Sequence, residues 1–398
     1  MTITPAPTSD SSSISATNPT STSTTTSTKA SSSTPATACS TTVTAFTDIP
    51  TAVASCTSIT LQDITVPGNN SIFLSKLLTN THVTFAGTTF FQFSNATAST
   101  LNMITVTGTN VTVDGAPGHV IDGNGPAWWD GQGSNGGVPK PDHFFVVSKV
   151  LGTSVIQNLN IKNYPVHCFD ITGCVGLTLQ NITLDMSDGY APNARSGGLP
   201  AAHNTDGFDL SNSNNTRVLD STVINQDDCI AITSGTQVLV SGLSCSGSHG
   251  LSIGSVGGKS QNTVTDITFT DSTCTNCQAG ARIKTNYNTT GLISGIVYEN
   301  IFVSNISQYG IDIQQDYLNG GPTGIPSNGV LISNITMTNI TGTAAASAQD
   351  YYILCGSGSC SDFTFNDIDI VGGGVQSMCN YEPVGDFTCD GGFNVTTT

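Results

Sequence analysis

One short pattern recurs along most of the chain, and it restricts the fold more than any other feature of the sequence. From about residue 100, β-branched runs of four to six residues are broken by Gly, Asn, Asp or Ser. Many of these runs are followed, about a dozen residues later, by a second strand-like run. The second runs begin 39, 22, 21, 30 and 30 residues apart, at FDIT (169), FDLS (208), IAITS (230), LSIGS (251), ARIKT (281) and IDIQQ (311).

A coil of about 21 residues with insertions in some turns explains these intervals, and self-similarity at such a period is typical of a solenoid. Because no helical segment separates the strands of a coil, we expect an all-β fold, a right-handed parallel β-helix of about ten coils. A β-sandwich is the alternative. It would require regular antiparallel hairpins with two-residue turns, and such signals are scarce in this sequence.

The first 38 residues differ from the rest in composition. They consist almost wholly of Ser, Thr, Ala and Pro, a composition that cannot bury a core and that is common in O-glycosylated stalks. We therefore predict a disordered Ser/Thr-rich tail over residues 1–38. A single parallel β-helix domain, which carries the chemistry, is predicted over residues 39–398.

Cysteines and sequons indicate the compartment. No stretch approaches the roughly 20 apolar residues of a membrane span, so we expect no membrane association, and the start MTITPAPTSDSSS lacks the layout of a signal peptide. Twelve cysteines and ten Asn-x-Ser/Thr sequons nevertheless favour an oxidising, glycosylating route. We predict a secreted, extracellular glycoprotein whose leader was removed or replaced. The sequons lie at Asn69, Asn95, Asn110, Asn181, Asn214, Asn288, Asn305, Asn334, Asn339 and Asn394.

Most cysteines fall in close pairs, which predicts local disulfides. A metal site at Cys274 and Cys277 is disfavoured, because zinc requires four ligands and neither a second CxxC nor a nearby histidine is present. We expect no bound metal. The predicted pairs are Cys39/Cys56, Cys168/Cys174, Cys229/Cys245, Cys274/Cys277, Cys355/Cys360 and Cys379/Cys389.

The chain is strongly acidic, with a net charge of −17 at pH 7 and a pI near 4.2. Nucleic-acid binding requires a basic face, so no nucleic-acid partner is expected. The balance suits a protein that works in acid, where part of this charge is neutralised. An anionic partner would need a local basic patch.

Aligning the second strands brings the scarce charged residues together. Their first inward residues are Phe208, Ile230, Leu251 and Ala281, and equivalent positions on successive coils stack at the strand spacing of about 4.8 Å. Two residues before the first three of these positions lie Asp206, Asp228 and His249. The same strip includes Asp227 and, by the alternation of a strand, the outward-pointing Arg282 and Lys284.

Three carboxylates in one cleft suit hydrolysis of a glycosidic bond, which requires one acid and one carboxylate that attacks the sugar or activates water. Asp206 and Asp228 share a position in the coil and could hold one water between them, which leaves Asp227 as the candidate acid. Such an inverting arrangement predicts an acid about 6.5 to 9.5 Å from the base. The alternative without a function is that these aspartates are solvated turn residues, but the spacing of one coil between Asp206 and Asp228 disfavours it.

These residues also carry a resemblance to a known family. NTDGFD (204–209), NQDDCIAI (225–232), SHGLSIGSVGG (248–258) and RIKT (282–285) resemble the four signature segments of the polygalacturonases of glycoside hydrolase family 28, in particular the fungal endopolygalacturonases. The resemblance runs from about Cys39 to Cys389. It implies a right-handed parallel β-helix that hydrolyses α-1,4 bonds between galacturonates of pectin with inversion, without a cofactor and as a monomer.

The resemblance also implies roles for single residues. The general acid falls on Asp227, the water-activating carboxylates on Asp206 and Asp228, and the histidine of the HG motif on His249. Substrate binding falls on Arg282 and Lys284, on Tyr317 and on Asn204 of NTDGFD, and we add His167 as a contact for a distal sugar. The chain departs from the family in having Ser248 before His249 and Gln314 before Gln315-Asp316-Tyr317, and neither change removes a proposed catalytic group.

Two classes of alternative stay open. One is another hydrolase of the same family, either an exo-polygalacturonase or an enzyme that cleaves rhamnogalacturonan or xylogalacturonan. RIKT with Tyr317 favours unsubstituted galacturonan, and the lack of a large insertion after Asp206 favours endo action. The other alternative is a non-catalytic β-helical adhesin that binds carbohydrate, which would have no need for Asp227 beside Asp206 and Asp228.

Overall fold

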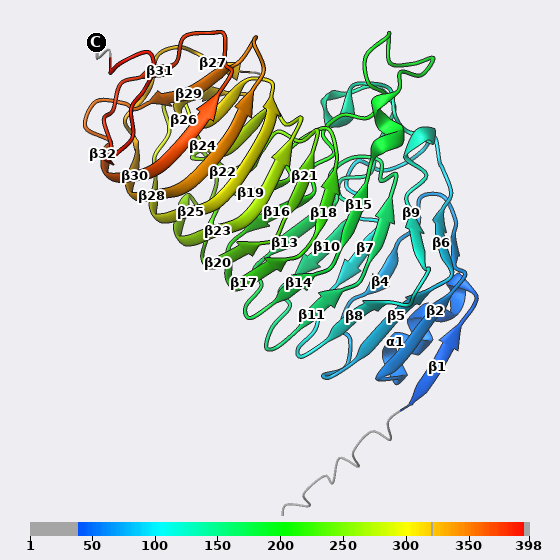
Figure 1. Cartoon of the computed structure of the whole chain (residues 1–398). Coiled ribbons are helices and arrows are strands. Elements are labelled where there is room, and N and C mark those ends of the chain that lie inside the picture. The colour runs from blue at the N-terminus through cyan, green and yellow to red at the C-terminus, as the bar shows by residue number, and fades with distance from the viewer. Residues whose placement is uncertain (1–38, 320, 394–398) are drawn as a thin grey trace, which may run out of the picture. The chain divides into compact units, whose positions relative to one another are not determined.

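The computed structural model describes residues 39–319 and 321–393, and the predicted tail over residues 1–38 lies outside them. Within the described residues the strands form two parallel sheets, one of 20 strands and one of 12. The strands of both sheets follow one another along the coils in chain order (Figure 1). The prediction of a right-handed parallel β-helix with about ten coils is confirmed.

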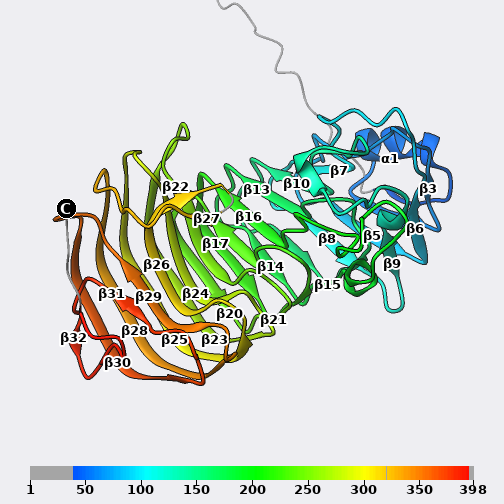
Figure 2. The same ribbon diagram turned by 90° about the horizontal axis from the view of Figure 1, so that it is seen from above.

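The 12-stranded sheet carries the second run of each repeat, and its strands are stacked in sequence order (Figure 2). Eleven of its strands pair in parallel, and β27 (Gly321–Pro322) adds antiparallel to β26. The eleven are β4 (Ile72–Leu74), β7 (Ile104–Val106), β10 (Phe145–Ser148), β13 (Phe169–Thr172), β16 (Phe208–Ser211), β19 (Ile230–Ile232), β22 (Leu251–Val256), β24 (Ala279–Asn286), β26 (Tyr309–Leu318), β29 (Gln349–Leu354) and β31 (Met378–Cys379).

The 20-stranded sheet carries the first runs. Coils in the N-terminal half contribute two short strands each to this sheet, and later coils contribute one long strand each. The change occurs at β23, which pairs with both β20 and β21. Its members are β1 (Ser40–Val43), β2 (Ser58–Gln62), β3 (Thr65–Val66), β5 (His82–Ala86), β6 (Thr88–Phe91), β8 (Thr112–Gly115), β9 (Val120–Asp122), β11 (Val155–Gln157), β12 (Asn160–Lys162), β14 (Thr178–Gln180), β15 (Thr183–Asp185), β17 (Ser213–Leu219), β18 (Thr222–Ile224), β20 (Gly235–Ser241), β21 (Ser244–Ser246), β23 (Thr263–Thr275), β25 (Gly291–Ile306), β28 (Val330–Ala344), β30 (Cys360–Val371) and β32 (Val384–Gly385).

The core consists of stacked inward residues. Phe145, Phe169, Phe208 and Ile230 occupy one register position on consecutive coils and are fully buried. The first three rings lie against one another, with centroids 4.8 Å apart for the tilted first pair and 5.2 Å apart for the stacked second pair. Because alternate residues of a strand point to opposite faces, this inward column leaves the intervening residues on the outer face of the 12-stranded sheet.

Asparagines at the turns explain why polar residues interrupt the apolar runs. Asn158 and Asn181 have positive φ angles of 56° and 51°, a conformation that asparagine tolerates better than most residues. The side-chain amide of Asn181 donates to Asn158 over 2.7 Å, and that of Asn158 donates to Asp114 over 2.7 Å. Equivalent turns on neighbouring coils are thereby tied together.

Short helices lie at the N-terminal end and in the loops. α1 (Ile49–Ser55), with Pro50 in its first turn, packs beside β1, β2 and β4 at the start of the solenoid. Within the described residues, none of the helices has the length and apolar character needed to cross a membrane. The 3-10 helices are η1 (Phe46–Asp48), η2 (Gly125–Ala127), η3 (Gly133–Asn135) and η4 (Ser187–Tyr190).

Five of the six predicted disulfides are present: Cys39–Cys56, Cys229–Cys245, Cys274–Cys277, Cys355–Cys360 and Cys379–Cys389. The prediction of Cys168–Cys174 is wrong, since both thiols are free and buried. The four residues of β13 lie between these two cysteines. An extended strand rises about 3.3 Å per residue, so its length exceeds the roughly 7 Å of Cα separation that a disulfide tolerates.

Candidate active site

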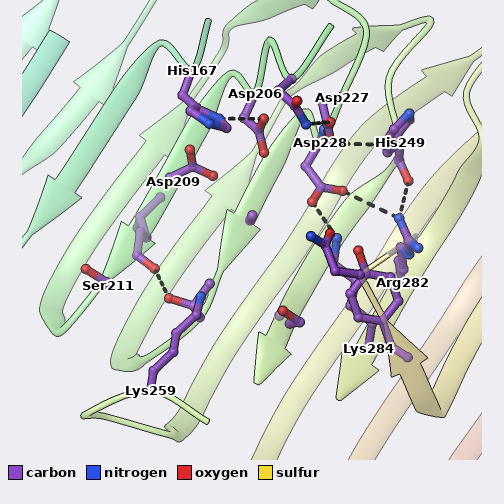
Figure 3. A pocket seen from close by; sticks show the side chains of 18 of the residues that line it. His167, Asp206, Asp209, Ser211, Asp227, Asp228, His249, Lys259, Arg282 and Lys284 are labelled. Carbon is purple, nitrogen blue, oxygen red and sulfur yellow. Dashed lines mark hydrogen bonds and ion pairs between the residues drawn. The ribbon is translucent and has the colours of Figure 1, made fainter. Parts of the chain in front are cut away.

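A cleft of about 990 Å³ runs along the outer face of the 12-stranded sheet. Its lining comes from the coils of β10 to β26 and includes every charged residue predicted for the site. Because β16, β19 and β22 pair in register, Asp206, Asp228 and His249 occupy equivalent positions on three consecutive coils. The predicted strip of acidic and basic groups is therefore formed (Figure 3).

Glycines beside the strip let the coils approach closely. A side chain at Gly207 would place its Cβ 2.5 Å from the carbonyl oxygen of Cys229 on the next coil. Gly250 has a φ of +123°, and its Cβ would lie 2.8 Å from the carbonyl oxygen of Ala279. The glycines of NTDG and SHG thus allow the residues before them to be stacked across neighbouring coils.

Asp206 is paired with a histidine of the preceding coil. Nδ1 of His167 lies 2.8 Å from Oδ1 of Asp206, and both side chains are largely buried. Burial, and next the charge of Asp227, raises the pKa of Asp206 above its ordinary value, while His167 opposes that rise. His167 thus lies directly beside Asp206 and lines the same cleft.

Asp227 accepts hydrogen bonds from three donors. Nδ1 of His249 lies 2.9 Å from its Oδ1, which also accepts from the backbone N–H of Asp228 over 2.8 Å. The side-chain amide of Asn204 donates to Oδ2 over 3.1 Å. Burial acts to raise the pKa of Asp227, but the hydrogen bond and charge of His249 hold it well below its usual range.

Asn204 is itself held in place by a loop. Its side-chain oxygen accepts hydrogen bonds from the backbone and hydroxyl of Ser134 and from the amide of Asn135, at 3.1 to 3.2 Å. These contacts fix which end of the Asn204 amide faces Asp227. The residue predicted to bind substrate therefore orients Asp227 in the structure.

Asp228 is bound through both of its oxygens. Nζ of Lys284 donates to Oδ2 over 2.6 Å, and the hydroxyl of Ser252 donates to Oδ1 over 2.7 Å. Nη1 of Arg282 lies 3.7 Å from Oδ1. Asp228 is thus linked to side chains from each of the next two coils.

Arg282 and Lys284 are almost fully buried at the base of the cleft, each with 7% of its side chain exposed. Arg282 donates from Nε to Oδ2 of Asp312 over 2.9 Å. Burial raises the pKa of Asp312 to about 6, although Arg282 opposes that rise. The ring of Tyr317 covers both cations, with its centroid 5.9 Å from Cζ of Arg282 and 5.4 Å from Nζ of Lys284.

The comparisons with known proteins decide the family. The model described as "Glycosyl hydrolases family 28" matches residues 56–389. The chain belongs to this family.

Relatives and solved structures agree with this assignment. A polygalacturonase of Fusarium fujikuroi is 55% identical over 340 residues, which cover 85% of this chain and 91% of that protein. A probable endopolygalacturonase D of Neosartorya fischeri is 55% identical over 340 residues, covering 85% and 71%. The structure of endopolygalacturonase I from Stereum purpureum, complexed with two galacturonate, has a TM-score of 0.74 at 30% identity and covers 85% and 96%. The predicted resemblance is confirmed, and the chain is a glycoside hydrolase.

The three aspartates of this family 28 chain are clustered. One oxygen from each of Asp206, Asp227 and Asp228 lies within 4.8 Å of the others. The separation of about 6.5 to 9.5 Å that is usual for inverting enzymes refers to whole carboxyl groups, and these nearest oxygens are closer than that. The reason is architectural, because Asp206 and Asp228 lie on adjacent coils at the strand spacing of about 4.8 Å and Asp227 is the chain neighbour of Asp228.

Two groups in the cleft have the spacing of potential cation ligands: His167, Asp206 and Asp209, and Asp206, Asp227 and Asp228. Two of these carboxylates already have a partner, since Asp206 is paired with His167 and Asp227 with His249, which belongs to neither group. Hydrolysis of a glycosidic bond by a pair of carboxyl groups requires no metal.

Three residues of this family 28 site were missed from the sequence. Asp209 is the residue of β16 that follows the inward Phe208, and burial raises its pKa well above the ordinary value. Ser252 and Asp312 lie in register on either side of Arg282. All three occupy the outward position that follows an inward residue, and applying the strand alternation to every coil would have identified them.

Proposed function

We propose that this family 28 chain is an endopolygalacturonase, which hydrolyses α-1,4-galacturonosyl bonds within de-esterified pectin by an inverting mechanism. The observation that carries the proposal is the contact of two buried cations, Arg282 and Lys284, with Asp228, one of three aspartates clustered in the same cleft. The aspartates suit glycosidic hydrolysis, and the cations suit a sugar that bears a carboxylate.

Recognition of galacturonate follows from this charge. Arg282 presents a planar fork and Lys284 a point charge, both of which form strong hydrogen bonds with carboxylates. Tyr317 lies over the two cations and can pack against a sugar ring beside them. A cationic floor in a protein of net charge −17 gives an anionic polysaccharide one defined place to bind.

In the proposed reaction Asp227 protonates the leaving oxygen, and Asp206 and Asp228 together hold and deprotonate the attacking water. The last two occupy equivalent positions on adjacent coils, which suits a shared water. Asp228 has both oxygens engaged by Lys284, Arg282 and Ser252. This engagement makes it a poor nucleophile, while one lone pair can still accept a proton from water.

The pKa of Asp227 is low in the free protein, whereas that of Asp206 is raised. Asp227 is therefore ionised before substrate binds, and its role as the acid requires a source for the proton that it donates. Burial lowers the pKa of His249, but the hydrogen bond and charge of Asp227, together with the charge of Asp228, outweigh this and raise the pKa. The proton needed by the leaving oxygen is therefore stored on His249 and reaches the substrate through Asp227. A bound galacturonate adds negative charge nearby, which favours a protonated Asp227.

The length of the cleft supports endo action. Its lining spans the coils of β10, β13, β16, β19, β22, β24 and β26, six steps that amount to about 29 Å at the strand spacing. Asp206 and Asp228 belong to coils near the middle, so a polysaccharide chain can extend in both directions from the reacting bond. The five disulfides fit the further proposal that the protein is secreted and acts on pectin outside the cell.

A product time course tests this function. Purified protein is incubated with polygalacturonate, and the reducing ends and product lengths are followed. We expect oligomers of many lengths at early times and a rapid fall in viscosity. Release of monomer alone from the start would favour an exo-acting enzyme, and no new reducing ends from any pectic polymer would favour the adhesin alternative.

A further inference from the structure

His167 contacts Asp206, and its predicted role as a contact for a distal sugar does not explain this contact. Its ring nitrogen Nδ1 lies 2.8 Å from Oδ1 of Asp206 (Figure 3). The two residues belong to adjacent coils, and the backbone N–H of Cys168, next to His167, donates to the carbonyl of Asp206 over 2.8 Å. The sheet ladder therefore fixes the spacing of the pair.

The three aspartates each have a different cationic partner. Asp206 is bound by His167, Asp227 by His249 and Asp228 by Lys284. We propose that His167 is a positioning residue that holds Asp206 in its ionised, water-activating form. The inference rests on the proposed function and goes beyond it by assigning a partner to the base.

The groups around His167 favour its charged form. Asp206, Asp209 and Asp227 face it from the coils of β16 and β19, and the ring of His143 lies against it with centroids 5.2 Å apart. His143 in turn is beside Asp142, with Nδ1 3.4 Å from Oδ2. Burial lowers the pKa of His167, but the charge and hydrogen bond of Asp206, together with the charges of Asp209 and Asp227, outweigh this and raise the pKa to about 9. His167 is thus a cation across the acidic range.

The consequence for Asp206 has a definite sign. Burial and the charge of Asp227 raise the pKa of Asp206, whereas the charge and hydrogen bond of His167 lower it. Without the charge of His167, Asp206 would bind its proton at a higher pH. A protonated Asp206 cannot accept a proton from water, so activity on the acid side would be lost at a higher pH than in the parent.

The test is the pH profile of kcat and kcat/KM on polygalacturonate for His167→Gln, with thermal melting to verify the fold. We expect the acid limb to move up by about 1 to 3 pH units, the usual effect of one opposite charge within 4 to 6 Å. Activity at the alkaline side of the profile should change far less. The matched control is His82→Gln, because His82 lies on β5 with 48% of its side chain exposed and outside the cleft lining.

A uniform loss of kcat at every pH, or a higher KM with the acid limb in place, would overturn the proposal and return His167 to substrate binding. If His167→Gln does not fold, the interaction between His167 and Asp206 is measured on the histidine instead, by NMR titration of the His167 ring in Asp206→Asn. The pKa of His167 should then fall by about 1 to 3 units, and an unchanged value would refute the coupling. An inactive parent would instead contradict the proposed function.

Discussion

Lys284 donates a 2.6 Å hydrogen bond from Nζ to Oδ2 of Asp228, a residue 56 positions earlier in the sequence. The two residues lie two coils apart, with His249 and Ser252 on the coil between them. Ser252 binds the other oxygen of Asp228. The cation that we propose binds substrate and the carboxylate that we propose activates water are therefore one structural unit, so changes to Lys284 should affect both binding and turnover.

Substitution of the proposed acid is the most direct test of its role. Asp227→Asn keeps the size of the side chain but cannot donate the proton to the leaving oxygen. We expect kcat to fall by at least the roughly 10²- to 10⁴-fold usual for one acid–base group, with the affinity for polygalacturonate retained. Steady-state kinetics and equilibrium binding measure the two effects. Near-parental turnover would transfer the acid role to another residue, with Asp206 as the next candidate because of its raised pKa.

The stereochemistry of the product tests how the close aspartates act. A water held by Asp206 and Asp228 attacks from the face opposite the leaving group, so the first-formed reducing end should have the inverted anomeric configuration. NMR of the product within the first minutes, before mutarotation, measures it. Retention would mean that one aspartate is a nucleophile, in keeping with the short separation of their oxygens.

Arg282 and Lys284 should differ in their effects. Arg282→Ala is expected to weaken polygalacturonate binding by roughly 1.5 to 3 kcal/mol for a lost charge-assisted hydrogen bond. Lys284→Ala should lower kcat in addition, because Asp228 loses the donor to its Oδ2. Binding isotherms and kinetics separate the two effects. Lys162→Ala is the matched control, since Lys162 lies on β12 and pairs with Asp122 outside the cleft lining.

Methyl esterification removes the negative charge of the galacturonate carboxylate, the group that Arg282 and Lys284 are proposed to bind. Highly esterified pectin should be a poor substrate for the parent, and both cation variants should discriminate less between esterified and free chains. If both variants kept the full preference of the parent for free chains, the cations would have a structural role and the substrate would bind elsewhere.

The disulfide Cys229–Cys245 should contribute strongly to stability, because it closes a loop of 16 residues directly after Asp228. Replacing both cysteines by alanine is expected to lower the free energy of unfolding by about 3 kcal/mol, the chain-entropy value for a loop of this length. The comparison is the double alanine variant of Cys355 and Cys360, which are five residues apart and should lose about 1 kcal/mol less. Denaturant unfolding measures both, and equal losses would contradict the loop-length argument.

Sequence alone was sufficient for the features that repeat. The period of the apolar runs predicted the coil, and the intervals of 22 and 21 residues between Phe208, Ile230 and Leu251 predicted which residues share a position across coils. This is possible because a solenoid places residues one coil apart at a constant spacing, so sequence separation converts directly into distance. The same logic placed Asp206, Asp228 and His249 in one strip, where the structure has them.

The tertiary structure decided what the repeat does not specify, namely which side chains contact one another within the strip. The pairing of His167 with Asp206, the binding of Asp228 by Ser252 and the free state of Cys168 depend on side-chain direction and on packing between coils. Close spacing in the sequence suggested a disulfide between Cys168 and Cys174, but the extended strand between them holds them apart. A period determines where a residue lies along the solenoid, whereas its partner is determined by the shape and charge of the neighbouring coils.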